Sequence, residues 1–151
     1  MDIKLMNMIM IKNTINEDVV VLDKKKKEGW EGLTFPGGKV EELESINDSV
    51  IREAKEETNL DIKNIKLVGS ISWIYKKDEK IHRDLGLLYE TTEFQGDLVE
   101  NNREGKLFWK NYDQFKNMKP KSDSMDYILK IYDRECSEVV MDLINGRIEF
   151  Y

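Results

Sequence analysis

Three glutamates crowd one short segment of the chain: Glu53, Glu56 and Glu57. On a helix, Glu53 and Glu57 would lie about 40° apart around the axis, with Glu56 about 60° to the other side of Glu53. Carboxylates gathered on one arc repel each other, and a bound divalent cation removes that repulsion. Mg²⁺ prefers oxygen ligands and leaves coordination positions for substrate phosphates. The spacing therefore indicates a metal site, against the competing interpretation of a solvated acidic helix face.

Two features near these glutamates favour the metal site. The glycines in the run Phe35-Pro36-Gly37-Gly38-Lys39 can form a tight bend whose backbone approaches a metal or a phosphate closely. Arg52, beside the cluster, can hold a glutamate in place through bidentate hydrogen bonds.

The full spacing is Gly38, five residues, Glu44, seven residues, then Arg52-Glu53-Ala54-x-Glu56-Glu57, which resembles the signature of the Nudix hydrolases. The resemblance implies an α+β fold, an α/β/α sandwich around a mixed sheet. It also implies that water attacks a nucleoside diphosphate linkage with the help of Mg²⁺ or Mn²⁺. Where the family usually has glycine this chain has Asn59, and asparagine also tolerates a left-handed helix terminus.

The resemblance also assigns roles to individual residues. Glu53, Glu56 and Glu57 are implied to be metal ligands, together with a backbone carbonyl near Gly38. We expect Glu53 to be the general base, with Glu57 or a loop residue as rivals. Glu44 and Arg52 are expected to hold these ligands in position rather than to bind the metal.

Looser matches point to one branch of the family. Residues 35–39, 92–98, 103–109 and 119–123 resemble the MutT-type enzymes that degrade oxidised purine nucleoside triphosphates. In that case Glu104 is an additional metal ligand or base, and the Asp123 carboxyl reads the N1/N2 edge of a guanine-like ring. A charge at a strand edge and a helix cap are the competing interpretations of these two residues.

Further substrate contacts are expected from Lys39 and from Arg83, which is predicted to lie with His82 in a turn between strands and to reach a phosphate. A solvated surface is the alternative for both His82 and Arg83. An aromatic wall could stack on the base, although aromatic residues in strands more often belong to the core. Its candidate members are Trp30, Phe35, Trp73 and Tyr75.

The helix that carries the glutamates is predicted over Ser45–Thr58. Ser45 can cap its start, with Asp48 three residues on. A stripe at a spacing of four residues should face the core: Ile46, Val50 and Ala54.

Strands are predicted at residues 5–11, 19–22, 65–75, 84–89 and 106–109 because these runs are rich in β-branched, aromatic and leucine residues. A second helix is predicted over Ser122–Tyr132, capped by Ser122 or Ser124. The end of the chain is predicted to form a hairpin of residues 138–144 and 147–151, because Asn145-Gly146 suits a type I′ turn. We expect a single domain over residues 1–151.

Composition narrows the partners. The chain of 151 residues has a formal net charge of −6, so it should repel a nucleic-acid duplex but can accept a small phosphorylated ligand at a local cation. The single cysteine, Cys136, excludes an internal disulfide and fits a reducing compartment. No apolar run is long enough to span a membrane, so a cytoplasmic protein is expected. The sequence indicates no oligomeric state.

The function expected from the sequence is a Mg²⁺-dependent Nudix pyrophosphohydrolase that converts nucleoside triphosphates such as 8-oxo-dGTP into the monophosphate and pyrophosphate. One alternative is a Nudix hydrolase of ADP-ribose, a dinucleoside polyphosphate or a capped RNA end. Another is a nucleotide-binding module without turnover, which the intact glutamates argue against.

Overall fold

A large mixed β-sheet dominates the computed structural model, which describes residues 1–25 and 31–151. The strands of this sheet are β1 (Asp2–Asn13), β2 (Asp18–Lys24), β3 (Gly32–Thr34), β4 (Gly37–Lys39), β6 (Lys66–Lys77), β7 (Lys80–Thr91), β9 (Asn101–Asn102), β10 (Gly105–Asn111), β11 (Glu138–Asp142) and β12 (Arg147–Phe150). Two further strands, β5 (Asp61–Lys63) and β8 (Glu93–Gln95), pair only with each other. The helices are α1 (Ile46–Thr58), α2 (Tyr112–Lys116) and α3 (Met125–Tyr132).

The strands follow one another in the order β12-β11-β6-β7-β1-β2-β10-β9, with β3 paired to β2 and β4 to β1. The β1–β7 and β11–β6 pairs are parallel and the remaining pairs are antiparallel. The long β1 strand touches several partners: β7 over most of its length, β4 at Met6–Met8 and β2 at its end. This strand therefore links the glycine segment of β4 to the centre of the sheet.

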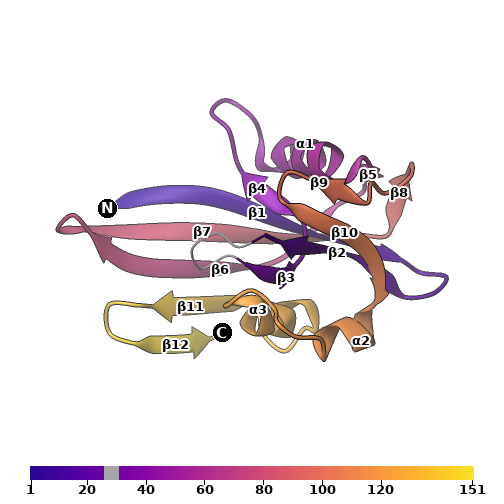
Figure 1. Ribbon diagram of the computed structural model, residues 1–151. Helices are drawn as coiled ribbons and strands as arrows, with labels where there is room; N and C mark the ends of the chain where they lie inside the picture. Colours follow the sequence, from indigo (N-terminus) through magenta and orange to yellow (C-terminus); the bar gives the residue numbers. More distant parts are fainter. Residues whose placement is uncertain (26–30) are drawn as a thin grey trace.

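Helices cover both faces of the sheet, with α1 on one side and α2 and α3 on the other (Figure 1). Each side has its own apolar core. Under α1 the core includes Ile9, Val50 and Ala54, and under α3 it includes Met10, Phe35 and Ile128. The alternation of β1 explains this division, because Ile9 and Met10 are neighbours in sequence and point to opposite faces. The α/β/α sandwich around a mixed sheet is thus confirmed.

The start and end of α1 follow from its sequence. The Ser45 side chain accepts a hydrogen bond from the Asp48 backbone N–H at 2.9 Å, the predicted cap, which stabilises a helix by about 1 kcal/mol. Val50 and Ala54 are fully buried, whereas Ile46 is only partly buried. The helix ends at Asn59, whose φ of 68° is left-handed. The turn thus survives without glycine, as expected.

The second predicted helix is shorter than its sequence pattern. It begins at Met125 instead of Ser122, because residues 120–122 lie along β3: the Leu33 N–H donates to the Pro120 carbonyl, and the Ser122 N–H donates to the Leu33 carbonyl. Ser124 precedes the helix but makes no side-chain cap. Its hydroxyl instead accepts a hydrogen bond from Trp73 Nε1 at 2.7 Å. The short helix α2, capped by Asn111, was not predicted.

Two turns differ from prediction. His82 and Arg83 lie within β7, since the β6–β7 turn is made by Asp78 and Glu79, both with positive φ. The C-terminal hairpin forms as expected, but its turn is longer than a two-residue type I′ turn. Gly146 has a positive φ and Asn145 does not, and the Asp142 carboxylate caps the turn by accepting the Ile144 and Asn145 N–H groups.

Each helix among the described residues is too short or too polar to cross a lipid bilayer.

Candidate functional site

A groove of about 1020 Å³ runs beside the carboxyl-terminal half of α1. Its acidic lining comes from α1, from Glu41 in the loop before it and from the β9–β10 turn, and the glycine strand β4 forms another part of its wall. The lining residues are Met6, Lys24, Gly37, Gly38, Lys39, Glu41, Glu53, Glu56, Glu57, Asn102, Arg103 and Glu104. The structure thus gathers at one groove all the residues predicted as metal ligands, and Lys39 with them.

Gly37 and Gly38 allow the backbone of β4 to lie against neighbouring groups, and they do not form a bend. They lie in the extended strand β4, paired with β1, and neither has a positive φ. A Cβ at Gly38 would meet the Glu53 carboxyl carbon at 2.2 Å, and one at Gly37 would meet the Asn7 carbonyl oxygen at 2.2 Å. The predicted tight bend is therefore wrong, and the predicted approach of this backbone to a metal or a phosphate stays a prediction.

A buried polar bridge fixes β4 to α1. Asn7 on β1 is 5% exposed; its Oδ1 accepts the Gly38 N–H at 3.3 Å, and its Nδ2 donates to Ser49 Oγ at 2.9 Å. The Ser49 hydroxyl donates in turn to the Ile46 carbonyl. Satisfied buried networks of this kind hold their elements in one arrangement. The sequence analysis missed both residues; the polar positions within otherwise apolar stripes of β1 and α1 were the available signal.

Arg52 is the central cation of the site. Its Nε and Nη2 donate to the two Glu44 oxygens at 3.0 and 2.7 Å, and Nη2 also donates to the Lys39 carbonyl. Its Nη1 donates to Glu53 at 3.0 Å and to Glu56 at 3.1 Å. These hydrogen bonds hold the pKa of Glu44 below its ordinary value. Arg52 thus joins the loop before α1, strand β4 and the acidic face of the helix.

Burial makes Glu57 the most perturbed carboxyl of the site. Desolvation, with the nearby charges of Glu53 and Glu104, raises its pKa to about 8, even though the Gly37 N–H donates to it at 3.2 Å. Desolvation also raises the pKa of Glu53, against the lowering effect of Arg52. Glu56 is different because its side chain is 57% exposed. Two of the three helix carboxylates are thus held where ionisation without a cation is unfavourable.

Glu104 reaches this cluster from the β9–β10 turn. Asn102 shapes that turn, since its Oδ1 accepts the N–H groups of Glu104 and Gly105 while its Nδ2 donates to the Glu57 carbonyl at 2.9 Å. Glu104 also lies 3.9 Å from the Lys24 ammonium. Asn102 therefore couples the end of α1 to the turn, a role that the sequence analysis did not predict.

A second pocket of about 400 Å³ continues from the groove and shares Met6, Lys24, Gly37, Gly38, Lys39 and Glu57 with it. Beyond this shared wall it has a mixed apolar and polar lining. The additional residues are Lys4, Asn7, Met8, Leu22, Thr34, Phe35, Asp84 and Ser122. Its size suits one small-molecule group bound next to the acidic groove.

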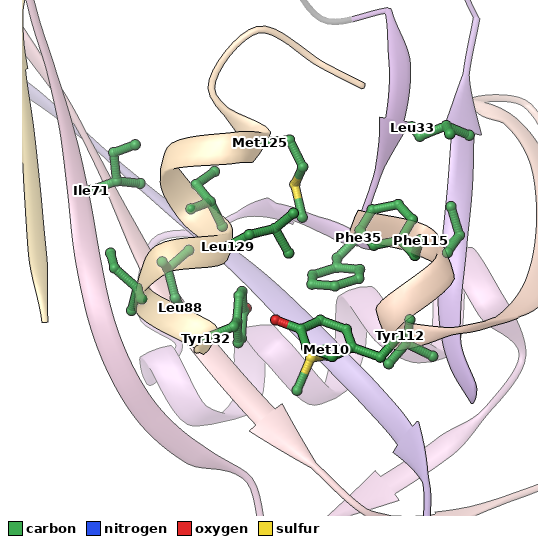
Figure 2. Packing of buried hydrophobic residues seen from close by; sticks show 14 of the residues in the cluster. Met10, Leu33, Phe35, Ile71, Leu88, Tyr112, Phe115, Met125, Leu129 and Tyr132 are labelled. Carbon is green, nitrogen blue, oxygen red and sulfur yellow. The ribbon is translucent and has the colours of Figure 1, made fainter. Parts of the chain in front are cut away.

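Of the predicted aromatic wall, Phe35 lies in the core and Trp73 packs against it. Phe35 is 1% exposed, and its ring packs on Phe115 and Tyr132 with centroids 5.2 and 5.3 Å away. Figure 2 shows this ring among the side chains of the apolar cluster. A ring buried to this extent belongs to the core and does not present its face to a base, but Phe35 also lines the second pocket, so its contact with a substrate stays a prediction. Tyr75 stacks on His82, and Trp30 lies outside the described residues.

Two other predicted contacts are not brought to the groove. Arg83 lines neither pocket and follows the opposite side of β7 from Asp84, because side chains alternate along a strand. Its Nε is buried without a hydrogen-bond partner among the described residues. The predicted position of Arg83 in a turn is therefore wrong, and neither pocket supports its predicted phosphate contact. Asp123 is exposed and does not line the pocket, whereas its neighbour Ser122 does.

The oxygen donors fit a hard divalent cation, although the side chains are not arranged around one. Among residues 1–25 and 31–151, no three acidic, histidine or cysteine side chains already form a metal-binding group. The contacts explain why: Glu53 and Glu56 bond to Arg52, and Glu57 bonds to Gly37. The fit rests on desolvated carboxyls that need a counter-charge and on the lack of a side chain at Gly38, which brings the backbone of β4 against the Glu53 carboxyl.

Comparison with protein families agrees with this geometry. The family described as the NUDIX domain matches residues 7–130, which include the second half of β1, the glycine strand, α1 and the β9–β10 turn. The chain belongs to the Nudix family. Members of this family are hydrolases that generally use divalent metal ions.

Individual relatives support the same assignment. The chain is 36% identical over 103 residues to the uncharacterized Nudix hydrolase YvcI of Bacillus subtilis, covering 68% of this chain and 64% of that protein. It is 35% identical over 69 residues to B. subtilis YtkD, whose name provisionally assigns it 8-oxo-dGTP diphosphatase activity; that match covers 46% and 44% of the two chains. The matched part thus spans less than two thirds of both relatives.

Solved structures of MutT proteins share the fold. The MutT protein of Bacillus halodurans superposes with a TM-score of 0.76 at 26% identity, covering 96% of this chain and 94% of that one. The NUDIX domain of Shewanella oneidensis NrtR, solved with ADP-ribose, superposes with a TM-score of 0.67 at 12% identity, covering 89% and 87%. The second likeness concerns the fold alone.

Proposed function

We propose that the chain is a Mg²⁺-dependent pyrophosphohydrolase of purine nucleoside triphosphates, including oxidised ones such as 8-oxo-dGTP, which releases a nucleoside monophosphate and pyrophosphate. The observation that carries this proposal is the meeting of Glu53, Glu56, Glu57 and Glu104 at one groove that continues into a pocket of nucleoside size. The likenesses to YtkD and to the B. halodurans MutT protein support the substrate class.

The glutamates of the groove would hold the ion, together with the backbone at Gly38. Magnesium bound there, or manganese in its place, supplies counter-charge to the phosphate oxygens and makes a water more acidic. Arg52 orients Glu53 and Glu56 through its hydrogen bonds, and Glu44 in turn orients Arg52. Lys39 and Lys24, which both line the groove, add positive charge where the phosphate chain would lie.

A proton must leave the attacking water, and a carboxylate of the groove accepts it. We favour Glu53 as this base, with Glu57 and Glu104 as rivals. A carboxyl partly removed from water is a stronger proton acceptor than an exposed one, which favours Glu53 and Glu57 over Glu56. Substitution of each glutamate by glutamine distinguishes the base from a metal ligand. Loss of the base should lower kcat more than it lowers the affinity for the metal.

Two measurements test the proposal. Glu56→Gln and Glu57→Gln should each abolish Mg²⁺-dependent release of pyrophosphate while the circular dichroism spectrum stays that of a folded protein; near-normal turnover would refute the metal assignment.

A substrate panel tests the nucleotide class. If kcat/KM is far higher for ADP-ribose, a dinucleoside polyphosphate or a capped RNA than for 8-oxo-dGTP, the triphosphate proposal is wrong. Absence of turnover on the whole panel would indicate a binding module.

A further inference from the structure

We propose that Asp84 is the residue that selects the base, and that it selects purines whose edge presents two adjacent N–H donors, as guanine does. This inference rests on the proposed function in taking the ligand to be a nucleotide. It concerns the second pocket, which begins at the glycine wall of the acidic groove and extends along β1 to β7.

The position of Asp84 follows from the strand pairing. β1 and β7 run parallel, with Lys4 opposite Asp84, Met6 opposite Gly86 and Met8 opposite Leu88. Residues two apart on a strand share a face, so Asp84 lies on the same side of the sheet as Met6 and Met8, which also line the pocket. Asp84 thus places a carboxylate next to the apolar side chains of Met6 and Met8 in the lining of the pocket.

Asp84 and Glu57 are the carboxylates among the described residues that line this pocket, and they differ in their hydrogen-bond partners. Glu57 belongs to the acidic groove and accepts the Gly37 N–H. Asp84 accepts a hydrogen bond from the Tyr75 hydroxyl at its Oδ1, at 3.1 Å, which orients the carboxylate from the side of β6. Tyr75 in turn stacks on His82 at 5.3 Å between ring centroids, so its own position is fixed by packing.

The chemistry of a carboxylate decides which base it accepts. Two oxygens in one plane accept from two neighbouring donors, and guanine offers N1–H and the 2-amino group side by side, an edge that oxidation at C8 leaves unchanged. Adenine presents an acceptor at N1, and inosine lacks the 2-amino group. Bidentate readout of a base discriminates by roughly 1–3 kcal/mol, or about 10-fold and more in affinity. Lys4, which lies opposite Asp84 on the neighbouring strand, also lines the pocket.

Equilibrium binding of guanosine and inosine monophosphates, measured by calorimetry on the full chain in Mg²⁺, tests this assignment. Wild type should bind the guanosine form about 10-fold more tightly, and Asp84→Asn should bring the two affinities to within about 2-fold. Tyr75→Phe should reduce the ratio only partly, because it removes the orienting hydrogen bond and keeps the carboxylate. Asp123→Asn, which changes an exposed aspartate outside the pocket, is the matched control and should keep the wild-type ratio.

Three results would overturn the assignment: equal affinities in wild type, an unchanged ratio in folded Asp84→Asn, or loss of the ratio in Asp123→Asn. If Asp84→Asn does not fold, Asp84→Ser serves the same comparison. The binding measurement is independent of turnover. Selective binding without pyrophosphate release would therefore refute the proposed function alone, and turnover without guanine selectivity would refute the role of Asp84 alone.

Discussion

Arg52 holds Glu44 through two parallel hydrogen bonds, from Nε to Oε2 at 3.0 Å and from Nη2 to Oε1 at 2.7 Å. The same guanidinium also donates to Glu53 and Glu56 through Nη1. Glu44 itself accepts the Glu41 backbone N–H at 2.7 Å, so it is fixed to the loop before α1. The pair thus transmits the position of that loop to the carboxylates on the helix.

Arg52→Lys should therefore weaken Mg²⁺ binding and activity by about 10- to 100-fold, because an ammonium cannot reproduce the planar fork that contacts Glu44 and the helix glutamates together. Metal titration and kcat/KM measure the effect. Lys55→Ala is the control: Lys55 lies on the same helix but pairs with Asp61, away from the groove. Equal metal affinity in Arg52→Lys and wild type would show that Arg52 does not position the ligands.

Glu57→Gln should stabilise the metal-free protein in a pH-dependent way. The folded-state pKa of about 8 lies above the ordinary value of 4.5, so the folded state holds the proton more tightly than the unfolded one. Stability from this group is full below pH 4.5 and declines as the pH rises to 8. Because glutamine stays neutral, the variant should match wild type near pH 4.5 and exceed it by up to a few kcal/mol above pH 8.

Urea denaturation in EDTA at pH 4.5, 6.5 and 8.5 measures this difference. Glu42→Gln, at an exposed position outside the groove, should show no such trend. A constant difference between Glu57→Gln and wild type at all three pH values would contradict the buried, protonated state. Added Mg²⁺ should stabilise wild type increasingly with pH, since binding requires the ionised carboxylate.

Replacement of the two glycines of β4 should have different effects, on activity at Gly38 and on stability at Gly37. Gly38→Ala places a methyl group against the Glu53 carboxyl, and misplacing that group should cost about 100-fold in kcat while the fold survives. Gly37→Ala meets the Asn7 backbone carbonyl instead, so it should separate β4 from β1 and destabilise by about 1–3 kcal/mol. Thermal denaturation and kinetics distinguish the two; full activity in Gly38→Ala would place Glu53 outside the chemistry.

Asn59 should tolerate glycine better than alanine. Its φ of 68° is strained for a residue with a Cβ, and asparagine is less affected than alanine, so Asn59→Ala should lose roughly 1 kcal/mol or more. Asn59→Gly relieves the strain but removes the Nδ2 bond to the Asp97 carbonyl at 3.2 Å, and should stay within about 1 kcal/mol of wild type. Activity should be unchanged in the glycine variant. A larger loss of stability in Asn59→Gly than in Asn59→Ala would contradict this account.

Local patterns were sufficient to predict much of the fold and the acidic face of α1. The spacing of Glu53, Glu56 and Glu57 lies within one helix, where geometry follows directly from sequence separation. The same holds for the Ser45 cap. The neighbouring glycines were predicted to form a bend and form a strand instead, since a glycine pair is equally compatible with both.

The remaining parts depend on contacts between distant segments. Asn7 and Ser49 are 42 residues apart, and neither shows from its own neighbours that it bridges β1 and α1. Phe35 was predicted as a member of an aromatic wall that stacks on the base, yet side chains of α2 and α3 bury its ring. Asp84 lies within a run of residues predicted as a strand, so it was not predicted to contact the base. That contact was predicted for Asp123, which stands beside a helix start. Only the pairing of β1 with β7 brings Asp84 to the pocket.

The wall of Gly37 and Gly38 belongs to both cavities, whereas their far ends are built from different elements: α1 and the β9–β10 turn for one, β7, β3 and the segment before α3 for the other. Under the proposed function, replacements at Thr34, Asp84 or Ser122 should therefore alter which nucleotide is accepted and leave the residues proposed to act on its phosphates unchanged. A library confined to these three positions offers a direct route to redesigned substrate range on an unchanged reaction centre.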